Sequence, residues 1–529
     1  MLLWQTKENK EQLLKQLVQH DSVTHSKGER IFVDMVRSEL QRLDYFKTND
    51  HIYFAYTDDD RRALVAHYAT SNSKDTIVLI SHYDTVGIDD FAEYKNLAFN
   101  VDAITENFKV NQAYLDEDAV NDADSGEYLF GRGVMDMKPG LMLHMALIEQ
   151  AINEAWDINL ILVTVPDEEV GSKGMLAAVK KLREIKERHD LNFVLHLNSE
   201  PTFQQEGNDA LHYVYTGTIG KIMPAVLVYG LETHVGNSLN GLSSNFVMSY
   251  INKHVEYNKD FKENFDGEST PPPVSLLMRD IKEHYDVQTP FRTVSLYNAF
   301  IFNRTAEEIF DIFNKNVKIA VKECITDLNR NLNTGLYSAT QELPVLTFES
   351  LYKQAVKQFG HEEIERVIDE AERSERDSHM KSIVIVDRLM TLMKQVTPAV
   401  VTFFTPPYYP AANSSKDEEV LKVVDEVKRI AATFHKESKE IHYFNGISDL
   451  SYVKYASNYL SDEVYSLNTP SFNRSYNIPF NDIKEISAPI VNIGPVGKDA
   501  HKISERLLKQ SAFVELPKML EAVIKNCYL

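Results

Sequence analysis

The sequence predicts an α/β protein with a mostly parallel sheet, helices on both faces of that sheet, and a smaller α+β domain inserted into the chain. Apolar runs that end in polar residues, at 76–86, 158–165 and 192–198, are typical of buried strands in a parallel sheet. Helix-like segments alternate with these runs, which indicates βαβ units. The chain has 529 residues, and since single cores stop growing at roughly 250–300 residues, we expect more than one domain.

The first 200 residues alternate between helix and strand. Leu13, Leu14 and Leu17 form one apolar stripe, and Pro139 stands where a helix tolerates proline, at its first turn. The expected elements are helices over 6–20 and 28–43, strands over 51–56, 64–69 and 76–86, a helix from Pro139, a strand over 158–165, a helix over 173–187 and a strand over 192–198. Residues 101–128 are rich in Asp, Asn and Glu, so we expect a surface excursion there.

The middle of the chain changes character. A β-α-β-α order, with strands over 221–230 and 293–302 and helices over 243–257 and 306–321, suits a separate ferredoxin-like domain. Long charged helices follow at 349–374 and 379–396, and the α/β pattern then returns with elements at 399–405, 417–434 and 488–494. We therefore expect one α/β domain built from residues 1–213 and 346–529, and an inserted domain at 214–345.

The composition limits the classes of partner. The formal charge of -22 argues against nucleic acid and anionic membranes, which both reward basic surfaces. The two cysteines, Cys324 and Cys527, have no metal-ligand spacing and indicate a reducing compartment. The N-terminus lacks the apolar region of a secretion signal, and no apolar run approaches the roughly 20 residues that span a bilayer. We expect a cytoplasmic protein that acts on a small molecule.

Imidazole and carboxylate groups follow several of the predicted strands. In open α/β sheets, ligands bind outside the carboxyl ends of the strands, so these side chains are expected at one edge of the sheet. The candidates are His82 and Asp84 after strand 76–81, Asp136 before the helix at Pro139, Asp167, Glu168 and Glu169 after strand 158–165, Glu200 after strand 192–198, and His501 after strand 488–494.

Such a group of carboxylates needs a multivalent cation, because unpaired carboxylates repel one another and rise in pKa. Histidine with carboxylate is a ligand set that suits zinc, and manganese or cobalt also fit. The charges of two zinc ions balance three carboxylates and one hydroxide, with Asp136, Glu169 and Glu200 as the carboxylates and His82 and His501 as neutral ligands. One carboxylate would then bridge the ions, and a water between them would lose its proton near neutral pH.

Neighbouring residues suggest supporting roles. His82 and Asp84 are separated by one residue, so on an extended backbone both point the same way and Asp84 is able to orient the imidazole. Glu168 and Glu169 are adjacent, so one is expected to bind metal and the other to act as a general base. Alone, each feature also has a structural interpretation: a histidine after a strand is usually structural, and an acidic pair is favoured at a helix N-terminus.

Five segments resemble, in the same order, the metal-site motifs of the M20 peptidase family: SHYDTVG, GRGVMDMKPG, PDEEVGSKG, LNSEPT and GPVGKDAHKISE. The resemblance implies that His82, Asp136, Glu169, Glu200 and His501 are the metal ligands, with Asp136 as the bridge. It implies that Asp84 orients a ligand and that Glu168 is the general base. Length and pattern are most similar to the RocB-like branch of bacterial arginine-utilisation proteins.

The family resemblance also implies a lid domain that mediates dimers. VLVYGLETHVGNSLNGLSSN resembles a lid strand of the family, in which a histidine helps to stabilise the oxyanion; here that residue is His234, and Asn245 matches a substrate-binding asparagine. NGISDL resembles a loop that holds the substrate carboxylate through backbone groups, which implies Gly446 and Ser448. The expected assembly is a homodimer through the lid.

The expected reaction is hydrolysis of an amide bond in a small substrate that bears a free carboxylate. Glu168 would activate the bridging water and later protonate the leaving amine, while zinc and His234 stabilise the oxyanion. Dipeptide cleavage and N-acyl amino acid deacylation both fit this chemistry. An alternative is a metal-stabilised binding or regulatory protein without turnover, although such a protein has no need of a base such as Glu168.

Overall fold

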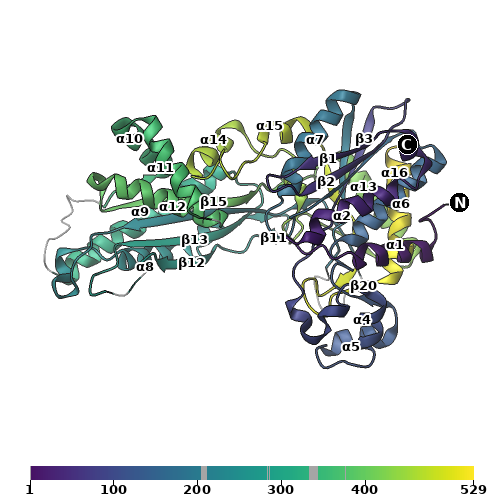
Figure 1. Cartoon of the computed structure of the whole chain (residues 1–529), viewed down its shortest axis with the longest axis horizontal. Coiled ribbons are helices and arrows are strands. Elements are labelled where there is room, and N and C mark those ends of the chain that lie inside the picture. The colour runs from purple at the N-terminus through teal and green to yellow at the C-terminus, as the bar shows by residue number, and fades with distance from the viewer. Residues whose placement is uncertain (1, 204–210, 283, 285, 333–342, 376) are drawn as a thin grey trace. The chain divides into compact units, whose positions relative to one another are not determined.

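The computed structural model describes residues 2–203, 211–282, 284, 286–332, 343–375 and 377–529. The chain forms two compact units. The first unit contains Met1–Thr218, Ala412–Tyr455 and Pro479–Leu529, and the second contains Ile219–Ala411 and Ala456–Ile478. The two ends of the chain therefore belong to the same unit, as the purple and yellow segments of Figure 1 show. Across the described residues, every helix is too short or too polar to cross a bilayer.

An eight-stranded sheet forms the centre of the first unit. Its strand order is β1 (Ile52–Tyr56), β2 (Arg62–Tyr68), β5 (Asn159–Val165), β3 (Asp75–His82), β6 (Asn192–Asn198), β18 (Ile490–Asn492), β7 (His212–Tyr215) and β17 (Ser438–Ile441). The four central strands β5, β3, β6 and β18 run parallel, whereas β1–β2, β2–β5 and β18–β7 are antiparallel. The sheet is thus mixed, with the expected parallel core.

Helices cover both faces of this sheet. Alternate side chains of β2, β3, β5 and β6 share one core with helices on one face. Those helices are α1 (Lys7–Gln19), α2 (Lys27–Leu40), α6 (Lys138–Glu154), α13 (Glu418–Thr433) and α16 (Leu516–Cys527). Helix α7 (Lys173–His189) lies outside that core and packs against β1, β2 and β5, with α15 (Phe480–Ile486) beside it. The predicted α/β class with helices on both faces is confirmed.

The acidic excursion is more ordered than the sequence indicates. Residues 101–128 form α4 (Val101–Phe108) and α5 (Glu117–Ser125), which lie between η1 (Asp89–Leu97) and β4 (Tyr128–Phe130). A small core under these elements contains Phe91, Ile104, Phe108 and Phe130. Strand β4 pairs with β20 (Arg506–Leu508), which pairs with β19 (Gly497–Lys498), so the excursion joins a three-stranded sheet near the C-terminus.

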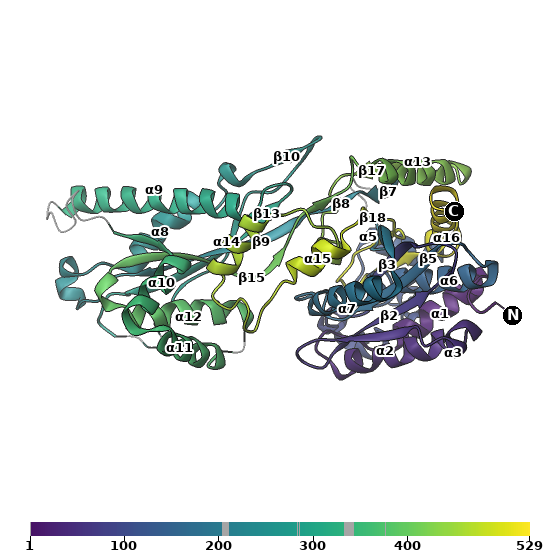
Figure 2. The same ribbon diagram turned by 90° about the horizontal axis from the view of Figure 1, so that it is seen from above.

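The second unit contains a five-stranded sheet in the order β12 (Val274–Asp280), β13 (Arg292–Ile301), β9 (Gly220–Tyr229), β15 (Ala399–Tyr409) and β14 (Val345–Thr347). Together with α8 (Ser244–Val255) and α9 (Ala306–Leu332), the long strands follow the β-α-β-β-α-β order of a ferredoxin-like arrangement. Figure 2 shows α9 on one side of this sheet and α12 on the other.

The inserted unit is larger than the expected 214–345. Helices α10 (Phe348–Phe359), α11 (His361–Arg373) and α12 (Ser378–Leu392) share a core with β9, β13 and β15 of the second sheet. Strand β15 pairs with β9 from Ala399↔Tyr229 to Tyr409↔Lys221. The expected boundary at 345/346 is therefore corrected to 411/412, because the last strand of the inserted sheet comes after the long helices. Residues 456–478, with α14 (Tyr459–Asn468), also belong to this unit.

Candidate metal centre

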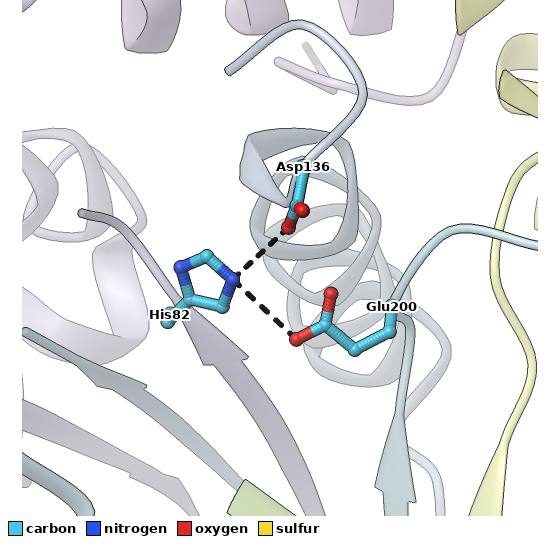
Figure 3. Close-up of side chains that lie close together, drawn as sticks. All are labelled: His82, Asp136 and Glu200. Atoms are coloured by element: carbon cyan, nitrogen blue, oxygen red, sulfur yellow. Dashed lines mark hydrogen bonds and ion pairs between the residues drawn. The ribbon is translucent and has the colours of Figure 1, made fainter. Parts of the chain in front are cut away.

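Three predicted ligands meet at the carboxyl ends of the central strands of the first unit. His82 is the last residue of β3, Glu200 follows β6, and Asp136 precedes α6. Figure 3 shows the carboxylates of Asp136 and Glu200 directed at one nitrogen of the His82 ring. His82 Nε2 lies 3.1 Å from Asp136 Oδ1 and 3.4 Å from Glu200 Oε1. These three side chains form a cluster that is able to hold a metal ion.

A second cluster shares Asp136 with the first. His501 Nε2 lies 3.2 Å from Asp136 Oδ2 and 3.1 Å from Glu169 Oε2. Asp136, Glu169 and His501 are again close enough together to hold a metal ion. Asp136 thus directs one carboxylate oxygen at each histidine, which is the arrangement expected of a carboxylate that bridges two ions.

The distances within both clusters fit metal coordination. Ligand atoms about 2.0–2.1 Å from a tetrahedral zinc ion are about 3.3 Å apart, which is close to the separations of 3.1–3.4 Å seen here. The side chains of Asp136, Glu169 and Glu200 are only 13 %, 6 % and 7 % exposed, so water screens their charges poorly. Buried carboxylates that converge on imidazoles are a donor set that suits zinc, manganese or cobalt.

Several buried ionisable groups of this site have strongly shifted pKa values, because the carboxylates lie close to one another and to the two imidazoles. Burial disfavours a charged His82, but the carboxylates of Glu200, Asp136 and Asp84 raise its pKa well above the ordinary value. Asp136 and Glu169 raise the pKa of His501 to about 10. Burial raises the pKa of Glu169 and Glu200, and the neighbouring Asp136 carboxylate adds to both shifts. Divalent cations would take the place of the protons that these groups otherwise retain.

Asp84 and a buried group of charged residues hold the turn that carries Glu168 and Glu169. Asp84 Oδ1 accepts a hydrogen bond from the Glu168 amide at 3.1 Å, and Asp84 Oδ2 accepts one from the Glu169 amide at 3.3 Å. Asp167, at φ 69°, begins this turn and receives Arg61 Nη1 at 2.6 Å. Arg61 also contacts Glu29 at 3.0 Å, and Glu29 accepts the Asp167 amide at 3.0 Å. A buried charge network therefore fixes the backbone of the turn from which the Glu168 and Glu169 side chains project.

Asp84 contacts His82 differently from the expectation. His82 Nδ1 lies 3.1 Å from the backbone carbonyl oxygen of Asp84, whereas the Asp84 carboxylate is 3.5 Å away. The carbonyl is thus the nearer acceptor for the ring, and the carboxylate accepts the amides of Glu168 and Glu169 and the Thr24 hydroxyl. Asp84 links one ligand strand to the acidic turn.

Glu168 occupies a buried position beside the first cluster. Its side chain is 9 % exposed and lies 3.8 Å from His82 Nε2. Its Oε1 atom is buried and has no hydrogen-bond donor among the described residues. Burial raises the pKa of Glu168 well above its usual range, and the carboxylates of Glu200, Asp449 and Glu169 raise it further. Such a carboxylate is suited to accept a proton near neutral pH.

The bridging candidate is held by a residue that the sequence reasoning missed. Glu505 accepts the Met135 amide at 3.2 Å and pairs with Arg132 at 2.7 Å. The Arg132 guanidinium also contacts Asp90 at 2.8 Å. Glu505 is buried and stands four residues after His501, so one short segment supplies a ligand and supports the backbone before Asp136. A buried acidic residue close after a ligand is the signal that could have identified it.

The predicted substrate loop also approaches the centre. Ser448 is buried, and its hydroxyl receives the Asn198 side-chain amide and the Leu450 amide, both at 3.2 Å. The next residue, Asp449, is 2 % exposed, and burial together with Asp84 and Asp167 raises its pKa to about 7. Asp449 acts electrostatically on Glu168 and Glu200, so it is a further carboxylate of the site that the sequence analysis did not select.

Glycines allow two backbone segments to approach closely at this centre. A Cβ atom on Gly494 would lie 1.7 Å from the Glu200 carbonyl oxygen. That carbonyl accepts the Asn492 side-chain amide at 3.1 Å. The end of β18 is therefore packed against the Glu200 backbone. At Gly446, a Cβ atom would lie 2.7 Å from the Phe444 ring, so the predicted substrate loop is also tightly packed.

Two predicted site residues belong to the second unit. His234 is exposed, and its Nδ1 accepts the Gly236 amide at 3.1 Å. Asn245 Oδ1 accepts the Thr293 hydroxyl at 2.6 Å. The contribution of either residue to catalysis stays a prediction.

Comparison with known proteins identifies the family. The model of peptidase family M20/M25/M40 matches residues 113–526. The uncharacterized protein YqjN of Bacillus subtilis (strain 168) is 38 % identical over 530 residues, which cover 98 % of this chain and 96 % of that protein. Protein RocB of the same strain is 29 % identical over 535 residues, which cover 97 % and 94 %. The predicted resemblance to the M20 family and its RocB-like branch is confirmed.

Solved structures share the fold at low sequence identity. An M20 family metallo-carboxypeptidase, Sso-CP2 from Sulfolobus solfataricus, is 11 % identical with a TM-score of 0.57, and the match covers 98 % of this chain and 99 % of that one. Human carnosine dipeptidase 1 is 11 % identical with a TM-score of 0.51, covering 99 % and 97 %. From the matched family model, the ordered motifs and the shared fold, we conclude that the chain belongs to peptidase family M20/M25/M40.

Proposed function

We propose that the chain is a hydrolase that uses two divalent metal ions, with zinc as the first candidate, to cleave an amide bond in a small substrate bearing a free carboxylate. The observation that carries this proposal is the Asp136 carboxylate, with Oδ1 3.1 Å from His82 and Oδ2 3.2 Å from His501. Each histidine is accompanied by one further carboxylate, Glu200 or Glu169. This arrangement supports two neighbouring ions that share one ligand.

The proposed ligands are His82, Asp136 and Glu200 for one ion and Asp136, Glu169 and His501 for the other. When bound, the two ions would polarise the substrate carbonyl and lower the pKa of a water molecule between them. Zinc suits this mixture of imidazole and carboxylate best, and manganese or cobalt would accept the same donors.

Glu168 is the proposed general base. Its carboxylate has a raised pKa and an oxygen that no donor of the described residues contacts, so it would take the proton from the attacking water and pass it to the leaving amine. Asp84 would keep this carboxylate in position, because it accepts the backbone amides of Glu168 and Glu169. A protein that only binds its ligand has no use for such a base, and this favours turnover.

Substrate contacts are proposed from both units. The loop with Gly446 and Ser448 would receive the substrate carboxylate through backbone groups, and Asn245 would contact the substrate. His234 would donate a hydrogen bond to the oxyanion that forms when the carbonyl is attacked. Within the first unit, the acidic residue Asp449 would add negative charge near Glu168.

We further propose that two copies associate through the second unit. Strand β12 lies at the edge of the sheet and exposes Val274, Leu276 and Met278, which are 37 %, 56 % and 42 % exposed. An apolar edge strand is a template for pairing with another strand. Light scattering on the purified protein tests this: we expect a dimer for the wild type and a monomer for Leu276→Lys. A monomeric wild type would contradict the dimer.

A substrate survey tests the proposed activity. The metal-free protein is loaded with zinc, manganese or cobalt and offered dipeptides in one set and N-acyl amino acids in another. Arginine-containing members belong in both sets, because the chain resembles the arginine-utilisation branch and RocB is 29 % identical. We expect amine release from one set and none from amides that lack a carboxylate. Bound metal without any release would favour a binding protein instead.

The two free cysteines, Cys324 and Cys527, support the proposal that the protein acts in the reducing cytoplasm.

A further inference from the structure

His501 differs from the other ligand candidates in how it is held. Its side chain is 48 % exposed, whereas His82 is 1 % exposed, so packing around the ring does not fix it. It lies in the turn between β19 and β20, where both Asp499 (φ 58°) and His501 (φ 66°) adopt left-handed backbone conformations. Such conformations are disfavoured for residues other than glycine and persist only where the surroundings impose them.

Arg506 imposes one of these constraints. It is 1 % exposed, and its guanidinium bonds to three carboxylates at once. One belongs to Asp499, in the turn of the hairpin itself, and the other two belong to Asp118 and Asp122 on α5. The planar guanidinium has fixed donor directions, so three simultaneous partners define the position of the hairpin relative to α5.

Two more contacts join the same hairpin to the folded segment 89–130, which contains the acidic excursion. Lys498 Nζ lies 2.9 Å from both Asp118 and Asp122. Ile503, two residues after His501, packs against the small core that contains Phe108 and Phe130. Strand β4 of the excursion completes the sheet by pairing with β20, with Phe130 opposite Arg506.

We propose that the acidic excursion is a brace that positions His501 and thereby sets the affinity of one of the two metal ions. The inference rests on the proposed two-ion site. Asp118 and Asp122 are positioning residues, because they act through Arg506 and the hairpin and do not contact the ligand cluster. The brace affects one ion more than the other: His501 belongs only to the cluster with Asp136 and Glu169, while His82 and Glu200 come from the ends of β3 and β6.

Asp122→Asn is the test variant. It removes the charge beside Arg506 Nε at 2.6 Å and Lys498 Nζ at 2.9 Å, and leaves every ligand in place. Zinc is titrated into the metal-free protein in the presence of a chelator, and bound zinc is counted by mass spectrometry. We expect one ion to bind about 10–100-fold more weakly than in the wild type, as for other residues that orient metal ligands, and the second ion to change less than twofold.

Two further variants show where the effect arises. Asp482→Asn is the matched control, because Asp482, on α15 of the same unit, is 19 % exposed and pairs with Arg183 of α7 at 2.8 Å. It should bind both ions as the wild type does. In a His501→Ala background, Asp122→Asn should cause no additional loss, because the brace would act only through that histidine. Arg506→Lys keeps the positive charge but lacks the planar guanidinium that contacts three carboxylates, so it should weaken the binding of the same ion as Asp122→Asn does.

The outcomes separate the inference from the proposed function. If the wild type binds two ions and Asp122→Asn weakens neither, or weakens both equally, the brace is overturned while the two-ion site stands. An additional loss in the His501→Ala background also overturns it. If the wild type binds fewer than two ions, the proposed two-ion site fails, and the inference fails with it.

Discussion

At the residue scale, the centre depends on carboxylates in different electrostatic states. Burial opposes the charge on Asp136, but hydrogen bonds from His501 and His82 keep its pKa well below the usual range. The pKa of Glu168 is instead raised, although both carboxylates lie within 4 Å of the same imidazole nitrogen. Because their surroundings shift the two pKa values in opposite directions, Asp136 is suited to be a ligand and Glu168 is suited to be a proton acceptor.

The role of Glu168 predicts the behaviour of Glu168→Gln. The amide has nearly the same shape but takes no proton, so turnover should fall roughly 10²–10⁴-fold. Zinc content should stay at the wild-type value, because Glu168 is not a proposed ligand. Steady-state kinetics on the substrate found in the survey and metal analysis measure both quantities. Glu184→Gln on the exposed face of α7 is the control, and a Glu168→Gln protein with near-wild-type turnover would contradict the assignment.

Asp449 predicts a shift in the pH profile. Its carboxylate raises the pKa of Glu168, so Asp449→Asn should lower that pKa. A general base works in its deprotonated form, so activity rises as pH increases through the pKa. The acidic limb of the kcat/KM profile should therefore move to lower pH in Asp449→Asn. An acidic limb that stays in place, or moves to higher pH, would show that Asp449 does not act on the base.

At the element scale, the acidic turn after β5 is held by charges that contact no proposed metal ligand. Arg61 and Glu29 are fully buried and Asp167 is 2 % exposed. Burial and the nearby Asp84 raise the pKa of Glu29 to about 7, so the Arg61 guanidinium offsets only part of the cost of burying this carboxylate. A buried ion pair costs much to desolvate, and its rupture leaves uncompensated charge.

Two neighbouring arginines make this network testable. Arg61→Met should lower the free energy of unfolding by about 3–5 kcal/mol, because Glu29 and Asp167 would be left without their buried cation. Arg62→Met is the matched control, since Arg62 pairs with the exposed Asp34 at 2.7 Å and such surface pairs contribute about 0–1 kcal/mol. Urea unfolding of the two variants compares these values. Equal losses for Arg61→Met and Arg62→Met would contradict the importance of burial.

The sequence was informative where an element has a local signature. The apolar runs that form β3, β5 and β6 end at His82, Val165 and Asn198, so the strand-end argument brings ligand candidates to one edge of the sheet. Arg61 and Glu29 have no local signature, because Arg61 and Asp167 are 106 residues apart and meet only in the folded chain. For the residues of helices α4 and α5 the sequence predicts only a surface excursion, since their many acidic residues obscure the few buried ones, such as Ile104 and Phe108.

Strand β12 was missed for a different reason. It lies at a sheet edge directly after Pro271–Pro273, and its apolar residues alternate weakly between exposed and half-buried positions. Edge strands bury little surface, so their sequences carry a weak periodic signal. The boundary at residue 411 could not be predicted either, because the pairing of β15 with β9 joins segments about 180 residues apart. Local periodicity indicates that a strand is present, but it does not indicate which other strand it pairs with.

At the scale of the whole molecule, buried neutral histidines should make the first unit sensitive to acid. Burial lowers the pKa of His67 and His144 to about 3 and that of His196 and His212 to about 4. Between the unfolded value of 6.5 and these lower values, the unfolded chain binds protons that the folded unit does not. The free energy of unfolding should therefore fall as the pH falls through this window.

One histidine gives a measurable share of that loss. Between pH 7 and pH 5, a single such group should cost about 2 kcal/mol. In His67→Phe the difference in unfolding free energy between these two pH values should shrink by about that amount, because the proton uptake of the unfolded chain is removed. His361→Gln, at a 69 % exposed position, serves as the control. An unchanged pH difference in His67→Phe would contradict the assignment of a neutral buried ring.

The position of His501 along the chain also orders events during synthesis. Four ligand candidates leave the ribosome by residue 200, the sheet of the second unit is complete by residue 409, and the last ligand candidate emerges only with residue 501. A nascent chain would therefore hold its early carboxylates without their final partner until residue 501 has emerged. In the proposed two-ion site, the second cation would be loaded only after that residue has left the ribosome, and hydrolytic competence would follow.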